Sequence, residues 1–171
     1  KEEADKVTSA VNGRLFRVVS VKKAVKLRHP APPFTTSTLQ QDANRKLSFS
    51  SAKTMKVAQE LYEGVNLGSH NGGVSGLITY MRTDSVRVSD EAYAATVSYI
   101  TESMGKEYLP DSRRIYKTKS GAQDAHEAIR PVNPSLHPDA VKSVLSADQY
   151  KLYKLIWARF MASQMASAKF D

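Results

Sequence analysis

Four stretches of the chain repeat apolar residues at the spacing of an amphipathic helix. They cover residues 35–46, 51–62, 89–104 and 146–165, and their apolar side chains recur every three or four positions. Thr38 with Gln41, and Ser146 with Gln149, have the spacing of a capping box. A short helix is also expected at residues 138–145, which begin with proline, and residues 1–13 are expected to form a frayed helix end or a tail. Together these stretches predict a mainly α fold of five or six helices, with a few short β-strands.

Three further stretches are typical of short strands, because they are apolar or β-branched and lack the helical repeat. Leu15–Leu27 predicts one long bent strand or two short ones, ended by the prolines of residues 30–33, since proline cannot donate to a ladder. Gly76–Thr79 predicts a short buried strand, and residues 166–171 predict the start of another.

A tyrosine, an arginine and an aspartate follow the Gly76–Thr79 segment at every second position. If the backbone stays extended there, Tyr80, Arg82 and Asp84 point to one side. A phenol has a pKa of about 10 and attacks phosphorus slowly unless a cation stabilises the phenolate. A guanidinium can do so and can hold two phosphate oxygens. The residues therefore fit phosphoryl transfer, with a buried tyrosine beside a surface arginine as the alternative.

Two more groups of polar residues are suited to phosphate. Thr35, Thr36, Ser37 and Thr38 place hydroxyls at the start of a predicted helix, where phosphate binds readily; plain helix capping is the alternative. His126 can carry or release a proton near neutral pH, and Arg130 could reach a phosphate.

Composition narrows the partners of this chain. Its 171 residues carry a formal net charge of +8, which favours a polyanion such as nucleic acid over an inert basic surface. The sequence has no Cys and four scattered His, so we expect no thiolate or histidine metal site. No apolar run approaches the length of a membrane span, so we expect no membrane partner.

Three strings carry a family resemblance. FTTSTLQQDA at 34–43, GLITYMRTDS at 76–85 and AHEAIRP at 125–131 resemble motifs of the type IA DNA topoisomerases, in that family's order. The resemblance implies that Tyr80 cleaves one DNA strand as a 5′-phosphotyrosine, that another strand passes through the gap, and that religation relaxes negative supercoils without ATP. It further implies that Arg82 stabilises the developing charge, His126 assists, and Asp84 orients one of them.

The resemblance also implies a DNA path and a division of the chain. The DNA-contacting residues would be Thr35, Thr36, Ser37, Thr38, Gln41, Thr83, Ser85 and Arg130. Residues 1–30 would belong to a β-rich arch domain, 31–165 to a helical, helix-turn-helix-like tyrosine domain, and 166–171 to a returning arch segment. The partners would be single-stranded or underwound DNA and the remaining domains of the same enzyme, in the cytoplasm with the nucleoid.

Nothing in the sequence looks like the Toprim domain, whose acidic residues bind Mg²⁺ in this family. We therefore expect a fragment with no cofactor of its own, inactive until Toprim and its Mg²⁺ are supplied. Two alternatives stay open on the residues alone. One is a helical nucleic-acid-binding or assembly module in which Tyr80 is structural, and the other is a basic helical domain that binds RNA.

Overall fold

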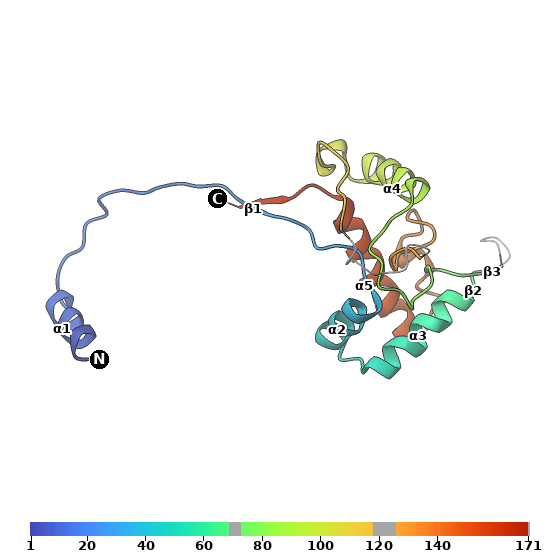
Figure 1. The fold of residues 1–171 in the computed structure, drawn as a ribbon, viewed down its shortest axis with the longest axis horizontal. Helices are drawn as coiled ribbons and strands as arrows, with labels where there is room; N and C mark the ends of the chain where they lie inside the picture. The colour runs from blue at the N-terminus through green and yellow to red at the C-terminus, as the bar shows by residue number, and fades with distance from the viewer. Residues whose placement is uncertain (69–72, 118–125, 171) are drawn as a thin grey trace.

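One long helix organises the body of the protein. The computed structural model describes residues 1–68, 73–117 and 126–170. Helix α5 (Ala147–Gln164) packs against α2 (Thr36–Leu47), α3 (Ser51–Glu63), α4 (Asp90–Ser103) and the 3₁₀ turn η3 (Pro138–Val141), and a second 3₁₀ turn, η2 (Lys106–Tyr108), follows α4 (Figure 1). Leu152, Ile156 and Phe160 of α5 are fully buried. The mainly α fold that the apolar spacing predicted is confirmed.

Hydroxyl side chains begin all four of these helices. Ser50, Ser89 and Ser146 each accept a hydrogen bond from a backbone N–H of the first turn, which satisfies a donor that the helix itself leaves open. At α2 the cap is Thr35, in a capping box with Thr38. The prediction that Thr38 pairs with Gln41 was wrong, because the hydroxyl of Thr38 reaches back to the backbone N–H of Thr35.

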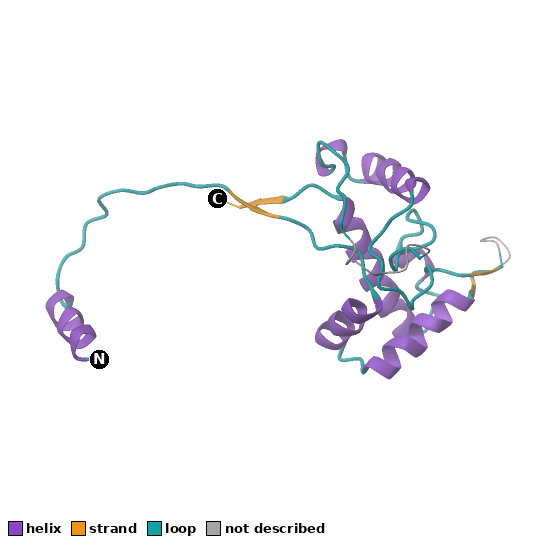
Figure 2. Cartoon of the chain, viewed as in Figure 1, coloured by secondary structure: helices purple, strands orange, loops and turns teal. Residues whose placement is uncertain are grey.

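The N-terminal part of the chain extends away from the helical body. Helix α1 (Glu2–Val11) has no buried residue, and the segment after it is exposed up to β1 (Lys26–Arg28) (Figure 2). Strand β1 pairs antiparallel with β4 (Ala168–Phe170), so a strand at the C-terminal end is present as predicted. The expectation of one long bent strand or two short ones over Leu15–Leu27 was wrong except for the last two residues, which belong to β1. Residues 15–25 form no strand, because no other described segment pairs with them.

The segment that leads to Tyr80 is extended and buried but forms little sheet. A hairpin of β2 (Val65–Asn66) and β3 (Val74–Ser75) precedes it. Leu77 and Ile78 are buried, and Ile78 makes an isolated bridge with Pro131. The strand expected at Gly76–Thr79 is reduced to this bridge, since Pro131 has no N–H with which to continue a ladder. No helix in the described part of the chain could cross a bilayer.

The buried carboxylate of Asp42 in α2 forms an ion pair with α5. Asp42 is 5 % exposed and pairs with Arg45, with Lys46 at 3.2 Å and with Arg159 of α5 at 3.3 Å. Arg159 also donates to the backbone oxygen of Pro32 at 2.7 Å, so this joint holds the chain just ahead of Thr35. Burial disfavours the charged form of Asp42. The hydrogen bonds and charges of its three basic partners outweigh burial and hold the pKa of this carboxyl below its ordinary value.

We expect Asp42→Asn to lower the free energy of unfolding by about 1–3 kcal/mol at pH 7, because a charged hydrogen-bond partner is lost. A carboxyl whose pKa is depressed by folding contributes stability above its unfolded pKa, about 3.9, and loses it as the pH falls through the folded value. The free energies of unfolding of the wild type and of Asp42→Asn, measured by urea unfolding at a series of pH values, should therefore converge as the pH falls into the acid range. Asp111→Asn, at an exposed position, is the control. A difference in free energy of unfolding between the wild type and Asp42→Asn that stays constant with pH would contradict the depressed pKa of Asp42.

Candidate active site

Three segments of backbone cross at the place where the three candidate motifs meet. The backbone N–H of Ile129 donates to the oxygen of Phe34 at 2.8 Å, and that of Thr79 donates to the oxygen of Arg130 at 2.9 Å. The N–H of Thr36 donates to the oxygen of Thr83 at 2.9 Å. Residues far apart in the sequence are thereby held side by side by main-chain bonds.

Two threonine hydroxyls complete the crossing. The hydroxyl of Thr36 donates to the oxygen of Met81 at 2.7 Å and accepts from the N–H of Thr83 at 2.9 Å. The hydroxyl of Thr79 donates to the oxygen of Ala128 at 2.7 Å and accepts from the N–H of Arg130 at 3.0 Å. Each hydroxyl thus joins two segments and satisfies two polar groups.

The segment from residue 80 to residue 85 alternates strictly between surface and interior. Tyr80, Arg82 and Asp84 are exposed, whereas the side chains between and after them, Met81, Thr83 and Ser85, are buried. This is the period-two alternation of an extended backbone, here without a strand. A phenol, a guanidinium and a carboxylate consequently face outward from one short segment.

Tyr80 is 38 % exposed, and two rings pack against its own. The ring of His126 lies 5.7 Å away between centroids, tilted by 45°. The ring of Tyr62, near the end of α3, lies 5.4 Å away in an edge-to-face arrangement at 64°. No sequence pattern singles out Tyr62 beyond the apolar face of its helix, because only the fold brings α3 beside Tyr80.

A cavity of about 500 Å³ opens beside the ring of His126. Arg82, Asp84 and His126 line it together with Thr35, Thr36, Ser37 and Thr83. It therefore combines a guanidinium, an imidazole and the first turn of α2, where the helix dipole favours an anion. The carboxylate of Asp84 partly offsets that positive charge. The arrangement can hold one phosphate group of a longer polyanion.

Several residues predicted to contact DNA lie elsewhere or have other partners. The hydroxyls of Thr83 and Ser85 are buried and accept from the backbone N–H of Ser85 and Arg87. The guanidinium of Arg130 is 13 % exposed and pairs with Glu127 at 2.6 Å.

The polar groups of Thr36, Thr83, Ser85 and Arg130 thus already have partners within the protein, and direct DNA contact by these residues stays a prediction. Thr38 is occupied in the capping box, and Gln41 is exposed one turn further along α2. Ala125, the first residue of AHEAIRP, lies outside the described residues.

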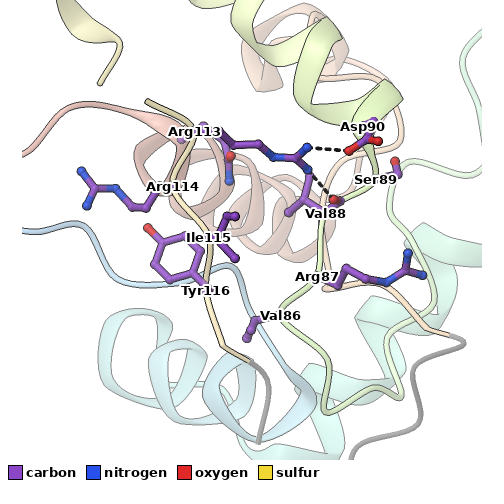
Figure 3. A pocket seen from close by; sticks show the side chains of 10 residues that line it. Val86, Arg87, Val88, Ser89, Asp90, Arg113, Arg114, Ile115 and Tyr116 are labelled. Atoms are coloured by element: carbon purple, nitrogen blue, oxygen red, sulfur yellow. Dashed lines mark hydrogen bonds and ion pairs between the residues drawn. The ribbon is translucent and has the colours of Figure 1, made fainter. Parts of the chain in front are cut away.

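A second cavity, of about 640 Å³, is lined by Arg87, Arg113 and Arg114 (Figure 3), of which Arg113 and Arg114 have hydrogen-bond partners within the protein. Arg113 pairs with Asp90 at 2.5 Å and donates to the oxygen of Val88 at 2.8 Å. Figure 3 shows the guanidinium groups of Arg87 and Arg114 pointing to opposite sides. Charges that diverge in this way do not build a common anion site.

A half-buried tyrosine, Tyr116, lines the same cavity. The hydroxyl of Tyr116 donates to the backbone oxygen of Ser163 at 2.8 Å, which ties the segment after η2 to the last turn of α5. Burial raises the pKa of Tyr116 above its ordinary value, although Arg114 and Arg159 act in the opposite direction. This phenol therefore stays protonated and serves as a structural donor.

An exposed tyrosine and an exposed arginine on one short segment, with the arginine lining a polar cavity, are typical of enzymes that break and rejoin nucleic-acid strands. The family described as DNA topoisomerase matches residues 1–171, and the chain belongs to that family. It is similar to full-length topoisomerase I of Thermotoga maritima, with 45% sequence identity and a TM-score of 0.79, which places it with the type IA enzymes. The match covers 96% of this chain and 26% of that one.

We expect Thr36→Val to lower the free energy of unfolding by about 1–3 kcal/mol, because the N–H of Thr83 loses its hydroxyl partner. Thr36→Ser keeps the hydroxyl and should stay close to the wild type. Hydrogen exchange should show faster exchange of the Thr83 amide in Thr36→Val alone. Equal exchange in all three proteins would mean that the hydroxyl does not hold the crossing.

Proposed function

We propose that this chain supplies the nucleophile for transient cleavage of one DNA strand by a type IA topoisomerase. The phenolic oxygen of Tyr80 attacks a backbone phosphorus, and its proton leaves to a base or to water. The bond from phosphorus to the 3′ oxygen breaks, and that oxygen takes up a proton to become a free 3′-hydroxyl. The 5′-phosphotyrosine that forms is a phosphodiester like the one broken, so religation reverses the step without ATP.

The outward alternation of Tyr80, Arg82 and Asp84 is the observation that supports this proposal best. A nucleophile must reach a phosphate that arrives from solvent, and the exposed phenol meets that requirement. Arg82 shares its face and can hold the phosphate oxygens while negative charge develops on them. His126 contacts the phenol ring and lines the same cavity, where it can donate to a phosphate oxygen or move a proton.

Asp84 and the first turn of α2 complete the proposed site. Asp84 lines the cavity with Arg82 and His126, so its carboxylate can orient either cation. Ser37 is exposed in the first turn of α2 and Thr35 lies at its cap, so their hydroxyls can meet a neighbouring phosphate. The other residues at the crossing keep these groups in place.

The chain is proposed to act as part of a longer enzyme. Among the described residues no cluster of three or more Asp, Glu, His or Cys side chains could hold a metal. Mg²⁺ held by the Toprim domain of the full enzyme would supply charge neutralisation at the phosphate. We propose that residues 1–30 and 166–171 belong to an arch domain, that 31–165 form the tyrosine domain, and that the chain alone does not relax DNA.

The test combines this chain with the complementary Toprim-containing portion, Mg²⁺ and a 5′- or 3′-labelled single strand. We expect a denaturant-resistant protein–DNA adduct that retains the 5′ phosphate, and we expect none with Tyr80→Phe. Arg82→Ala should lower the yield about 100-fold, within the range seen when a charge-stabilising donor is removed. Tyr108→Phe, at an exposed tyrosine of η2, should leave the yield unchanged.

Three outcomes would contradict the proposal. The first is an adduct of unchanged yield with Tyr80→Phe. The second is relaxation of a negatively supercoiled plasmid by this chain alone, which would remove the need for a second portion. The third is tight binding of DNA or RNA by the complete mixture with no adduct, which is the result expected of a non-catalytic nucleic-acid-binding module.

A further inference from the structure

The reactive ring is held at its edge by a neighbour that takes no part in the chemistry. Tyr62 lies in the last turn of α3, one residue before the helix ends at Glu63. Its ring meets that of Tyr80 edge to face at 5.4 Å, a geometry that the opposite charges of aromatic faces and edges favour. Within the described residues neither hydroxyl has a hydrogen-bond partner, so the contact is between rings.

The backbone fixes the position of Tyr62 relative to Tyr80. The N–H of Leu77 donates to the oxygen of Leu61 at 2.8 Å. A Cβ at Gly76 would lie 2.6 Å from the backbone oxygen of Tyr62, closer than real side chains approach, so glycine is required for this fit. The end of α3 and the segment leading to Tyr80 are thus in direct contact, which fixes the backbone of Tyr62 beside that segment.

The phenol of Tyr80 needs such support because burial does not supply it. A ring that is 38 % exposed retains freedom about its two side-chain torsions, and each misplaced orientation moves the hydroxyl away from the line of attack. Holding the reacting atom in its productive geometry can account for a large part of a rate enhancement. His126 touches the same ring, but it also lines the cavity, so it is not free to serve the ring alone.

We propose that Tyr62 is a positioning residue for strand cleavage, which orients the ring of Tyr80 for attack on the phosphate. The inference rests on the proposed function, because it concerns how Tyr80 performs that step. Tyr62 acts through its ring and not through its hydroxyl. It therefore influences the rate of cleavage at saturating DNA and leaves the affinity for DNA unchanged.

The experiment uses the full-length enzyme that carries this segment, with Tyr62→Phe, Tyr62→Ala and the matched control Tyr108→Ala. We expect Tyr62→Ala to lower the single-turnover cleavage rate at saturating oligonucleotide about tenfold, which corresponds to ~1.4 kcal/mol. Tyr62→Phe keeps the ring and should stay within about twofold of the wild type. The dissociation constant for the oligonucleotide and the thermal midpoint should not change in any variant.

A second measurement reports on the ring without any reaction. In protein with ring-labelled tyrosine, Tyr62→Ala should shift the ring resonances of Tyr80, because the neighbouring ring current is lost, and Tyr62→Phe should leave them nearly in place. Resonances of Tyr80 that do not move would overturn the inference.

The cleavage assay has outcomes that separate the inference from the proposed function. If the wild type forms no adduct, the proposed function fails. If the wild type forms one and Tyr62→Ala cleaves at the same rate, only the positioning role fails. Equal loss in Tyr62→Phe and Tyr62→Ala would assign the effect to the hydroxyl, and a rise in the dissociation constant alone would make Tyr62 a DNA contact; both overturn the inference.

Discussion

The candidate site depends on the hydroxyl groups of Thr36 and Thr79, which hydrogen-bond its backbone segments to one another. Each is half-buried, and each donates to one backbone oxygen and accepts from one backbone N–H of another segment. The segments that they join are irregular, so no sheet or helix would otherwise satisfy their polar groups. A side chain of the same shape without the hydroxyl would leave buried polar groups unpaired, which is costlier than losing an exposed contact.

These hydrogen bonds explain how an irregular segment can present side chains as regularly as a strand. Backbone bonds on both sides of residues 79–83 hold them extended, and buried Met81 anchors the segment from within. Tyr80 and Arg82 then face solvent with little freedom in their backbone. The proposed attack of Tyr80 on a phosphate needs a phenol that is both exposed to solvent and held in place, and the crossing provides both.

The positive charge of the chain serves two purposes that sequence composition cannot separate. Arg113, Arg130 and Arg159 pair with carboxylates or backbone oxygens and hold segments together. Arg82 is exposed and lines the cavity beside His126. A formal charge of +8 therefore indicates a polyanionic partner, but only part of that charge is available to bind one.

The sequence by itself determined the four long helices of the body, the cap at Ser146, the alternation around Tyr80 and the family, because these features depend on neighbours close along the chain. It failed over Leu15–Leu27, where a strand needs a partner that β4 offers to three residues only. Tertiary structure alone decided which polar residues face the cavity and which, such as Ser85, are buried away from it in structural roles. It also decided that Tyr62 lies against Tyr80, since that contact arises where the end of α3 meets a later segment and no local pattern encodes it.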